Sequence, residues 1–138
     1  MPFKEGDIRV LALGIITKNG KVLACPGYDA VRNLKFYRII GGGVEFGEPS
    51  ELAVKREFKE ELGYDIYITR QLGCIENIFE FHGKKGHEIL FVYAAEFSDK
   101  TLYNKKEFTL DDDNKHVKAV WVDYTKNTVF PEGIAKYL

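Results

Sequence analysis

The chain has 138 residues, 45% of them hydrophobic, and its 20 lysines and arginines against 21 aspartates and glutamates give a formal net charge of −1. This length and composition exclude a disordered chain, and we expect residues 1–138 to form a single folded domain. Near-neutral charge without a basic stripe argues against a nucleic-acid partner, so a ligand that carries phosphate needs a local binding device.

Neither a membrane span nor a disulfide framework is predicted. The longest apolar run, Val10–Ile16, falls far short of the roughly 20 residues that cross a bilayer. The first residues are mixed and acidic, unlike a secretory signal. Cys25 and Cys74 match no metal-binding spacing, and we expect both to be reduced core residues of a cytoplasmic protein.

The first third of the chain is typical of β-strands. Ile8–Ile16 and Val22–Ala24 are apolar runs separated by Asn19-Gly20, a strong hairpin-turn signal, so we expect the two strands to pair antiparallel. Another strand is predicted at Phe36–Ile40. It continues into Gly41-Gly42-Gly43, where the glycines indicate a bend in the backbone.

From Ser50–Leu62 the apolar residues recur with the period of a helix. Val54 and Phe58 belong to an apolar stripe, and Gly63 is suitably placed to cap the C-terminus. Two alternatives remain for the N-terminus, because either Pro49 is the first helical residue or Ser50 is the cap. Three carboxylates share a separate arc of about 100° on this helix, those of Glu57, Glu60 and Glu61.

The second half of the chain alternates predicted strands with polar turns. The strands are Ile66–Thr69, Cys74–Phe81, Ile89–Phe97 and Val117–Val122. We expect His82–His87 to close a second hairpin, Asp111–Lys115 to form a polar loop and Pro131–Leu138 to form a short helix. Helices at two points in a chain of strands favour an α/β fold, with a mixed sheet covered on both faces.

The acidic arc of the helix indicates a metal site. Three carboxylates within one turn repel each other and raise each other's pKa values unless a cation lies among them. Ligation by oxygen alone selects a hard ion such as Mg²⁺, which shares its coordination between carboxylates and phosphate oxygens. Arg56 adjoins Glu57 and lies one turn before Glu60, so its guanidinium could hold a carboxylate in a fixed orientation.

The residues around this arc match a longer pattern. Gly42, Glu48 and Arg56-Glu57-Phe58-Lys59-Glu60-Glu61-Leu62-Gly63-Tyr64 follow the spacing Gly-x5-Glu-x7-Arg-Glu-U-x-Glu-Glu-x-Gly-U, with U apolar. This pattern resembles the Nudix box, and the order of strands and helices around it is similar to the rest of a Nudix domain. Two positions depart from the pattern, since Ile40 stands where a proline often precedes the glycines and Tyr64 fills the last apolar position. Neither is a ligand position.

The resemblance implies an α/β/α sandwich with a mixed sheet that hydrolyses a nucleoside diphosphate linked to another group. By position it implies that Glu57, Glu60 and Glu61 are metal ligands and that the Gly42 carbonyl is a further ligand. Arg56 would orient Glu57, and Glu48 would be an auxiliary acidic residue. We predict Mg²⁺ as the cofactor, with Mn²⁺ as an alternative.

Residues outside the box are less specific. A general base beyond the box is common in the family, and the candidates are Glu76, Glu80, His87, Glu88 and Asp111–Asp113. Glu88 is favoured because it follows a glycine-containing turn at the start of a strand. Arg38 is interpreted either as a phosphate contact or as a surface cation. Phe79 and Phe81 are interpreted either as core aromatics or as residues that stack on a base.

The sequence favours one substrate class by elimination. The proline of ADP-ribose hydrolases and the tyrosine of diadenosine polyphosphate hydrolases are missing after the box. We therefore predict a MutT-like nucleoside triphosphate pyrophosphohydrolase with a small-molecule nucleotide substrate. The alternatives are a hydrolase of dinucleoside polyphosphates or other nucleotide derivatives, a hydrolase of RNA 5′ ends, and a non-catalytic nucleotide sensor. A monomer and a homodimer are both left open.

Overall fold

The computed structural model describes the backbone of residues 5–112 and 115–138 and the side chains of residues 5–111 and 117–138. Within these residues the strands are β1 (Ile8–Ile15), β2 (Thr17–Lys18), β3 (Lys21–Asp29), β4 (Leu34–Gly43), β5 (Ile66–Phe81), β6 (Lys84–Phe97), β7 (Glu107–Asp112), β8 (Lys115–Asp123) and β9 (Val129–Phe130). The helices are α1 (Ser50–Leu62) and two short 3-10 helices, η1 (Lys100–Asn104) and η2 (Ile134–Tyr137).

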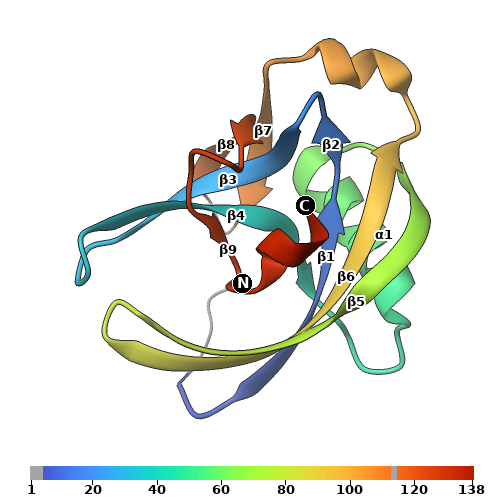
Figure 1. Ribbon diagram of the computed structural model, residues 1–138. Helices are drawn as coiled ribbons and strands as arrows, with labels where there is room; N and C mark the ends of the chain where they lie inside the picture. The colour runs from blue at the N-terminus through green and yellow to red at the C-terminus, as the bar shows by residue number, and fades with distance from the viewer. Residues whose placement is uncertain (1–4, 113–114) are drawn as a thin grey trace.

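The strands form one mixed sheet in the order β5-β6-β1-β4-β3-β8-β7 (Figure 1). β1 lies inside the sheet, parallel to β6 and antiparallel to β4. The remaining neighbours along this order are antiparallel, β2 pairs with β3, and β9 runs parallel to β4. The α/β class and the mixed sheet predicted from the sequence are therefore confirmed.

The sheet separates two hydrophobic cores, as β1 illustrates. Leu11 and Leu13 point to one face, into a core that includes Ile134 of η2. Ala12, between them, points to the opposite face, into the core that α1 covers. This alternation follows from the two-residue period of a β-strand. Both faces are covered as predicted, although the C-terminal cover contains a 3-10 helix of four residues rather than a helix over Pro131–Leu138.

α1 packs on the sheet through the predicted apolar stripe. Val54, Phe58 and Leu62 are buried, and a Cβ added at Gly14 of β1 would lie 2.7 Å from the Phe58 ring. The helix backbone can therefore approach the sheet closely at this point. Gly63 ends the helix in the left-handed conformation, at φ 83°, and its N–H donates to carbonyls of the last turn, which confirms the predicted C-cap.

The helix begins at Ser50. Pro49 precedes it in an extended conformation and occupies the N-cap position without a side-chain hydrogen bond. Both alternatives from the sequence are therefore wrong, because Pro49 is not helical and Ser50 is not the cap. Glu51 lies in the first turn, near the positive end of the helix dipole.

Two long hairpins, β3–β4 and β5–β6, project on the same side of the molecule (Figure 1). In the second hairpin Phe81 pairs with Lys84, so the turn consists of His82 and Gly83 alone. Both have positive φ angles, 53° and 76°, as a type I′ turn requires. The predicted turn over His82–His87 is therefore too long, and its last four residues belong to β6.

The predicted turn at Asn19-Gly20 is present, with φ angles of 49° and 77°. It joins only the two residues of β2 to the start of β3. The predicted antiparallel pairing of Ile8–Ile16 with Val22–Ala24 is wrong, because β6 and β4 occupy the two edges of β1. A turn signal identifies where the chain reverses and does not decide which long strand pairs with which.

Gly41, Gly42 and Gly43 continue β4 and do not bend it. A Cβ added at Gly41 would lie 2.1 Å from the carbonyl oxygen of Ala12, and one added at Gly42 would lie 2.2 Å from Cδ of Glu57. The predicted bend is therefore wrong. Glycines are needed here because β1 and α1 come too close for a side chain.

Two further predicted elements are corrected by the pairing. Asp111, Asp112 and Lys115, which were predicted to lie in a loop, belong instead to the paired strands β7 and β8, where Asp112 pairs with Lys115. Asp113 and Asn114 lie outside the described residues. Ile66–Thr69 and Cys74–Phe81 are parts of one strand, β5, which stays paired with β6 across two register shifts. Such bulges place one extra residue in a strand without ending it.

The two cysteines differ in their exposure to solvent. Cys25 is buried as predicted, but Cys74 is exposed on β5, so its predicted core position is wrong.

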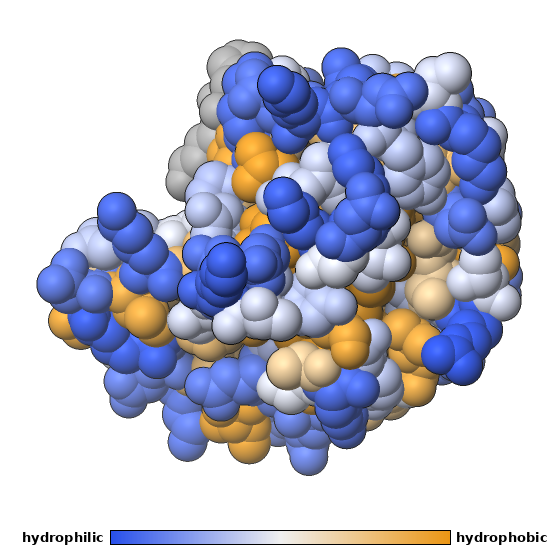
Figure 2. All heavy atoms as spheres, turned by 45° about the horizontal axis from the view of Figure 1, so that its top comes forward, coloured by the Kyte–Doolittle hydropathy of each residue, from blue (hydrophilic) through white to orange (hydrophobic). Residues whose placement is uncertain are grey.

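On the face shown in Figure 2, hydrophobic residues form small separate patches between hydrophilic ones. In the part of the chain that the structure describes, every helix is too short or too polar to cross a bilayer.

Candidate active site

The end of β4 and the middle of α1 meet at Gly42 and Glu57. The side chain of Glu57 is only 13% exposed, and its carboxylate fills the space beside Gly42 that a Cβ would take. Glycine is therefore the residue that lets the sheet hold this carboxylate against the backbone of β4. The spacing that suggested the Nudix box thus corresponds to a direct contact between Gly42, the first glycine of the pattern, and Glu57, the first of its three glutamates at the end of the pattern.

Arg56 joins the box residues to one another. Its Nε and Nη2 donate to the two carboxylate oxygens of Glu48, at 2.7 and 2.9 Å, and Nη2 also donates to the Gly43 carbonyl at 2.9 Å. Its Nη1 donates to Glu57 at 2.9 Å and to Glu60 at 3.2 Å. A planar guanidinium that makes paired bonds of this kind fixes direction as well as distance. The predicted contact between Arg56 and Glu57 is present in the structure.

The pairing with Arg56 determines the charge of Glu48. Hydrogen bonds from Arg56, together with the backbone N–H of Glu45, lower the pKa of Glu48 to about 2. In return, the hydrogen bond to Glu48 raises the pKa of Arg56 above its already high ordinary value. Both groups therefore stay ionised over the range in which enzymes work.

The other two box glutamates lie on either side of this network. The side chain of Glu60 is 58% exposed and contacts Arg56 from the solvent side. Glu61 is half-buried and lines a cleft together with Gly41 and Gly42. Within residues 5–111 and 117–138, no three acidic, histidine or cysteine side chains converge on a single point. The box thus places carboxylate oxygens that are suitable metal ligands on one face of the helix, with Arg56 between them.

The cleft beside Glu61 has a volume of about 850 Å³, a size typical of small-molecule sites. Its floor carries a polar row across three neighbouring strands, since Asn77 of β5 pairs with Glu88 of β6 and Glu88 pairs with Arg9 of β1. Leu11 and Leu90 form the next, apolar row. Parallel pairing of β1 with β6 is what places Arg9 beside Glu88.

Glu88 is largely buried in this floor, with a side chain 12% exposed. Its carboxylate lies 3.8 Å from Nη1 of Arg9. Burial raises the pKa of Glu88, and the positive charges of Arg9 and Arg38 oppose that rise. The Nε of Arg9 is buried and has no hydrogen-bond acceptor within the described part of the chain. A buried donor of this kind gains free energy when an anionic oxygen reaches it.

Aromatic side chains form the walls of the cleft. The ring of Phe79 lies over Gly86 of the neighbouring strand, where a Cβ would come within 2.3 Å of it. The ring of Phe36 covers Gly27 in the same way, at 2.5 Å. Phe81 contacts Phe36 edge to face, with ring centroids 6.0 Å apart. Each hairpin thus presents an aromatic ring over a glycine to the same cleft.

The structure shows which of the candidate residues outside the box reach the cleft. Arg38, Phe79, Phe81 and Glu88 all line the cleft that Glu61 lines. Sequence reasoning missed Arg9 and Asn77, which share the floor with Glu88. For Arg9 a signal existed, namely one cation inside the apolar run that forms β1. Asn77 gave no such signal.

The remaining candidates for a general base lie elsewhere or lack a buried setting. His87 Nε2 lies 3.2 Å from Glu76 in an exposed pair that does not line the cleft. Glu80 lines the cleft but is exposed. Asp111 is exposed on β7, the side chain of Asp112 is not described, and Asp113 lies outside the described residues.

The family model for the NUDIX domain matches residues 7–137. The chain belongs to the NUDIX family. Membership makes it a Nudix hydrolase, and such enzymes act on small-molecule nucleotides and generally use divalent metals. A search of curated protein sequences gave no match.

Solved Nudix structures share the fold over nearly the whole chain. The MutT NUDIX hydrolase from Burkholderia pseudomallei is 26% identical, with a TM-score of 0.62 and coverage of 95% of this chain and 94% of that one. The E. coli ORF135 protein is 22% identical, with a TM-score of 0.62 and coverage of 94% and 85%. A UDP-X diphosphatase is 15% identical, with a TM-score of 0.61 and coverage of 94% and 58%. The last two likenesses concern the fold alone.

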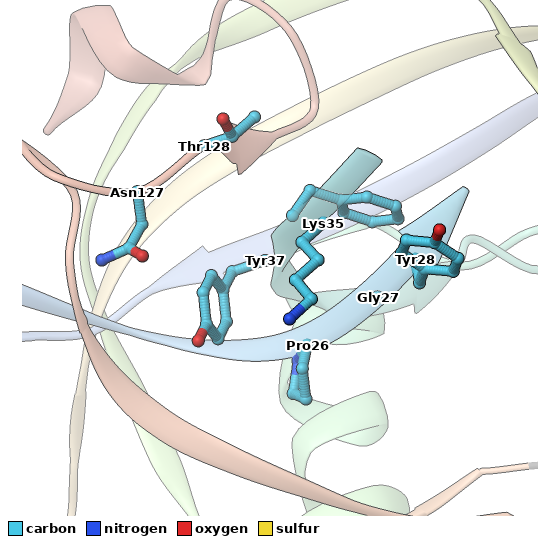
Figure 3. Close-up of a pocket in the computed structure, with 8 residues that line it drawn as sticks. Pro26, Gly27, Tyr28, Lys35, Tyr37, Asn127 and Thr128 are labelled. Carbon is cyan, nitrogen blue, oxygen red and sulfur yellow. The ribbon is translucent and has the colours of Figure 1, made fainter. Parts of the chain in front are cut away.

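This Nudix domain has a second pocket, of about 590 Å³, on the β3–β4 hairpin (Figure 3). Its lining residues are Pro26, Gly27, Tyr28, Lys35, Phe36, Tyr37, Asn127 and Thr128. None belongs to the Nudix box, and none carries a carboxylate. The larger cleft is therefore the place where the box can meet a substrate.

Proposed function

We propose that this Nudix hydrolase cleaves a nucleoside diphosphate linked to another group, and that its main substrates are nucleoside triphosphates, converted to the monophosphate and pyrophosphate. One observation carries the proposal. The box reaches the cleft through Glu61 and Gly42, and the floor of the same cleft holds the buried Glu88 beside Arg9. The 26% identity to a MutT NUDIX hydrolase over nearly the whole of both chains supports the substrate class.

The residues present fit a magnesium ion. Every donor on the box face is an oxygen, and Gly42 keeps open the space in which Glu57 lies. Such a donor set selects a hard dication, Mg²⁺ or Mn²⁺. Glu57, Glu60, Glu61 and the Gly42 carbonyl would hold it. When bound, the ion neutralises negative charge that develops on the phosphate oxygens.

The chain's own residues have separate tasks. Arg56 holds Glu57 in its direction, because it is itself fixed by both oxygens of Glu48. Water attacks one of the two phosphorus atoms of the α–β anhydride, the bond between that phosphorus and the bridging oxygen breaks, and the products are the nucleoside monophosphate and pyrophosphate. Glu88 accepts the proton that the attacking water gives up. Its burial keeps the carboxylate poorly solvated and hence a stronger base.

The substrate contacts are supported by charge and shape. Arg38 lines the cleft next to Gly41 and Gly42, so its guanidinium is placed to pair with phosphate oxygens. Phe79 and Phe81 line the aromatic side of the cleft, and an aromatic ring there gives a flat apolar surface for a base. In this proposal these contacts let a cleft lined by three arginines and four glutamates hold a polyanion.

A substrate panel tests the proposal. The protein is incubated with the nucleoside triphosphates, diadenosine tetraphosphate, ADP-ribose and a nucleotide sugar in Mg²⁺, and the products are identified. We expect nucleoside monophosphate and pyrophosphate as the main products, at rates that fall by at least about 100-fold in Glu61→Gln. Faster cleavage of another compound in the panel would show that the main substrates belong to the class of that compound and are not nucleoside triphosphates. Recovery of every compound intact would overturn the hydrolase proposal.

A further inference from the structure

Asn77 and Asp29 are the two buried polar residues in the part of the chain that the structure describes. Asp29 is fully satisfied, since its carboxylate accepts hydrogen bonds from the backbone N–H groups of Val31 and Arg32 and from Arg32 Nε. The amide of Asn77, a residue only 8% exposed, makes no side-chain hydrogen bond to a described residue. A buried polar group without a partner costs free energy. Because Asn77 lines the cleft, its amide is available to a molecule bound there.

Arg9, in the same row of the cleft floor, is also incompletely paired. Its Nε is buried and has no acceptor in the described chain, and its Nη1 lies 3.8 Å from the Glu88 carboxylate, which is too far for a hydrogen bond. The guanidinium is therefore held near Glu88 by charge and not by paired bonds. Because Nε itself is covered, the flexible side chain has to turn toward the cleft for this donor to meet an anionic oxygen.

Arg9 and Asn77 lie at different distances from the Nudix box. β4, which carries Gly42, is the neighbour of β1, and its Gly43 pairs with Leu11, two residues after Arg9. In the strand order β5-β6-β1-β4, Arg9 is one strand from β4 and Asn77 is three strands from it. Neighbouring strands lie about 4.8 Å apart, so the row extends about 14 Å from β4 across the sheet.

The chemistry of the floor changes along this direction. On the two strands nearest the box, Arg9 and Arg38 bring positive charge to the cleft. On β5 the polar side chain is the neutral amide of Asn77, and Phe79, two residues further along the same strand, adds an aromatic ring. A guanidinium pairs with phosphate oxygens, whereas an amide beside an aromatic ring suits the neutral polar groups and the flat base of a nucleoside.

We propose that the substrate lies across the strands of the cleft floor, with its phosphates at Arg9 and its nucleoside at Asn77. This proposal rests on the function proposed above and adds the direction of the bound nucleotide and two residues that bind it. Arg9 donates to a phosphate oxygen beside the box, and Asn77 forms a hydrogen bond with a polar group of the nucleoside. Glu88, between them in the row, then lies at the level of the α–β anhydride.

The test uses two ligands that differ by the nucleoside. Inorganic pyrophosphate and α,β-methylene-ATP, in which the α–β bond cannot be hydrolysed, are each titrated into the protein in Mg²⁺ by calorimetry. Arg9→Met removes the charge and keeps the length of the side chain, and Asn77→Leu removes the hydrogen bonds and keeps the shape. The matched controls are Arg70→Met and Asn104→Leu, because both residues are exposed and neither lines the cleft. Arg9→Lys and Asn77→Ala replace a variant that does not fold.

The two substitutions should affect the two ligands differently. We expect Arg9→Met to weaken the binding of both pyrophosphate and the nucleotide by at least about ten-fold, because both carry phosphate. Asn77→Leu should weaken the nucleotide by at least about fivefold and leave pyrophosphate within about twofold of the wild type. The melting temperature of Asn77→Leu should not fall, because no hydrogen bond within the protein is lost. Both controls should bind both ligands as the wild type does.

Three results would overturn this orientation. They are pyrophosphate affinity within about twofold of the wild type in Arg9→Met, equal weakening of both ligands in Asn77→Leu, and a wild type that binds neither ligand. A failure of the proposed function has a different signature. If the ligands bind as expected but ATP is recovered intact after incubation with the wild type, the orientation is supported and the hydrolase proposal is overturned.

Discussion

The carboxylate of Glu57 occupies the space that any side chain at Gly42 would fill, because an added Cβ would lie 2.2 Å from its Cδ. The neighbouring Gly41 is restricted for another reason, since its Cβ would lie 2.1 Å from the backbone oxygen of Ala12. Gly42 thus leaves room for the flexible side chain of Glu57, and Gly41 leaves room for the backbone of the neighbouring strand β1. The two positions can therefore be told apart by experiment.

Gly42→Ala should displace Glu57 while leaving the fold intact. We expect kcat to fall by about 10- to 100-fold, because small misplacements of reacting groups have effects of that size. Gly41→Ala is the comparison, and its contact with the backbone should lower the free energy of unfolding by roughly 1–3 kcal/mol or more. Nucleotide hydrolysis and thermal melting measured on both variants check this division. Equal destabilisation by the two substitutions would contradict it.

Glu60→Gln and Glu61→Gln should lower turnover by orders of magnitude, about 100-fold or more, because each removes a negative charge from the proposed metal site. Neither side chain is buried in the core, so melting temperatures should change little. Glu51→Gln provides the control, as Glu51 is an exposed carboxylate on the same helix. The metal-ligand assignment fails if both box variants keep wild-type turnover in Mg²⁺.

Glu48 should contribute stability that acid removes. Arg56 lowers the pKa of Glu48 from its ordinary 4.5 to about 2, so folding favours the ionised form. This contribution is complete above about pH 4.5 and disappears as the pH falls through about 2. Glu48→Gln should therefore melt below the wild type at neutral pH, and the gap should narrow in acid. Thermal melts from neutral to strongly acidic pH measure the gap, and a constant gap would count against this linkage.

Glu88 should set the acid limb of the pH–rate profile. Burial raises the pKa of Glu88, so a base at this position loses activity at a pH above the range usual for glutamate. Arg9 opposes that rise, and Arg9→Gln should move the limb to higher pH. Glu88→Gln should lower kcat by about 10²- to 10⁴-fold.

The control for this profile is Glu76→Gln. Glu76 lies on the strand that pairs with Glu88, but it is exposed and does not line the cleft. Its variant should keep both the rate and the acid limb of the wild type. An unshifted limb in Arg9→Gln, or normal turnover in Glu88→Gln, would show that another group accepts the proton.

The parts that could be predicted from sequence are those governed by local spacing. The arc that holds Glu57 and Glu61, the cap at Gly63 and the apolar stripe through Phe58 all follow from the geometry of one helix. The glycines of β4 were misinterpreted because a glycine cluster normally indicates a turn. Here close approach of β1 and α1 requires them, and nothing near Gly41 in the sequence shows that approach.

The cleft depended on pairings that no local pattern specifies. Arg9 and Glu88 are far apart in the chain and meet only because β1 pairs in parallel with β6. Phe36 and Phe81 meet edge to face, although their strands, β4 and β5, are separated by β1 and β6 in the sheet. Candidate residues in and near the box could thus be named from the sequence. The sequence could not predict which residues of the other strands would form the rest of the cleft with them.

The same parallel pairing governs the order in which the molecule can assemble. β1 is synthesised before β6, and one of its edges stays unpaired until Lys84–Phe97 has left the ribosome. α1, with 13 residues, is too short to persist in water without the sheet beneath it. We expect the sheet to close slowly and late in folding, because its pairings join residues far apart in the sequence. The acidic helix α1 and the strand β6 then become ordered together. A nascent chain ending before β6 therefore carries every box residue but lacks the sheet that holds them in place.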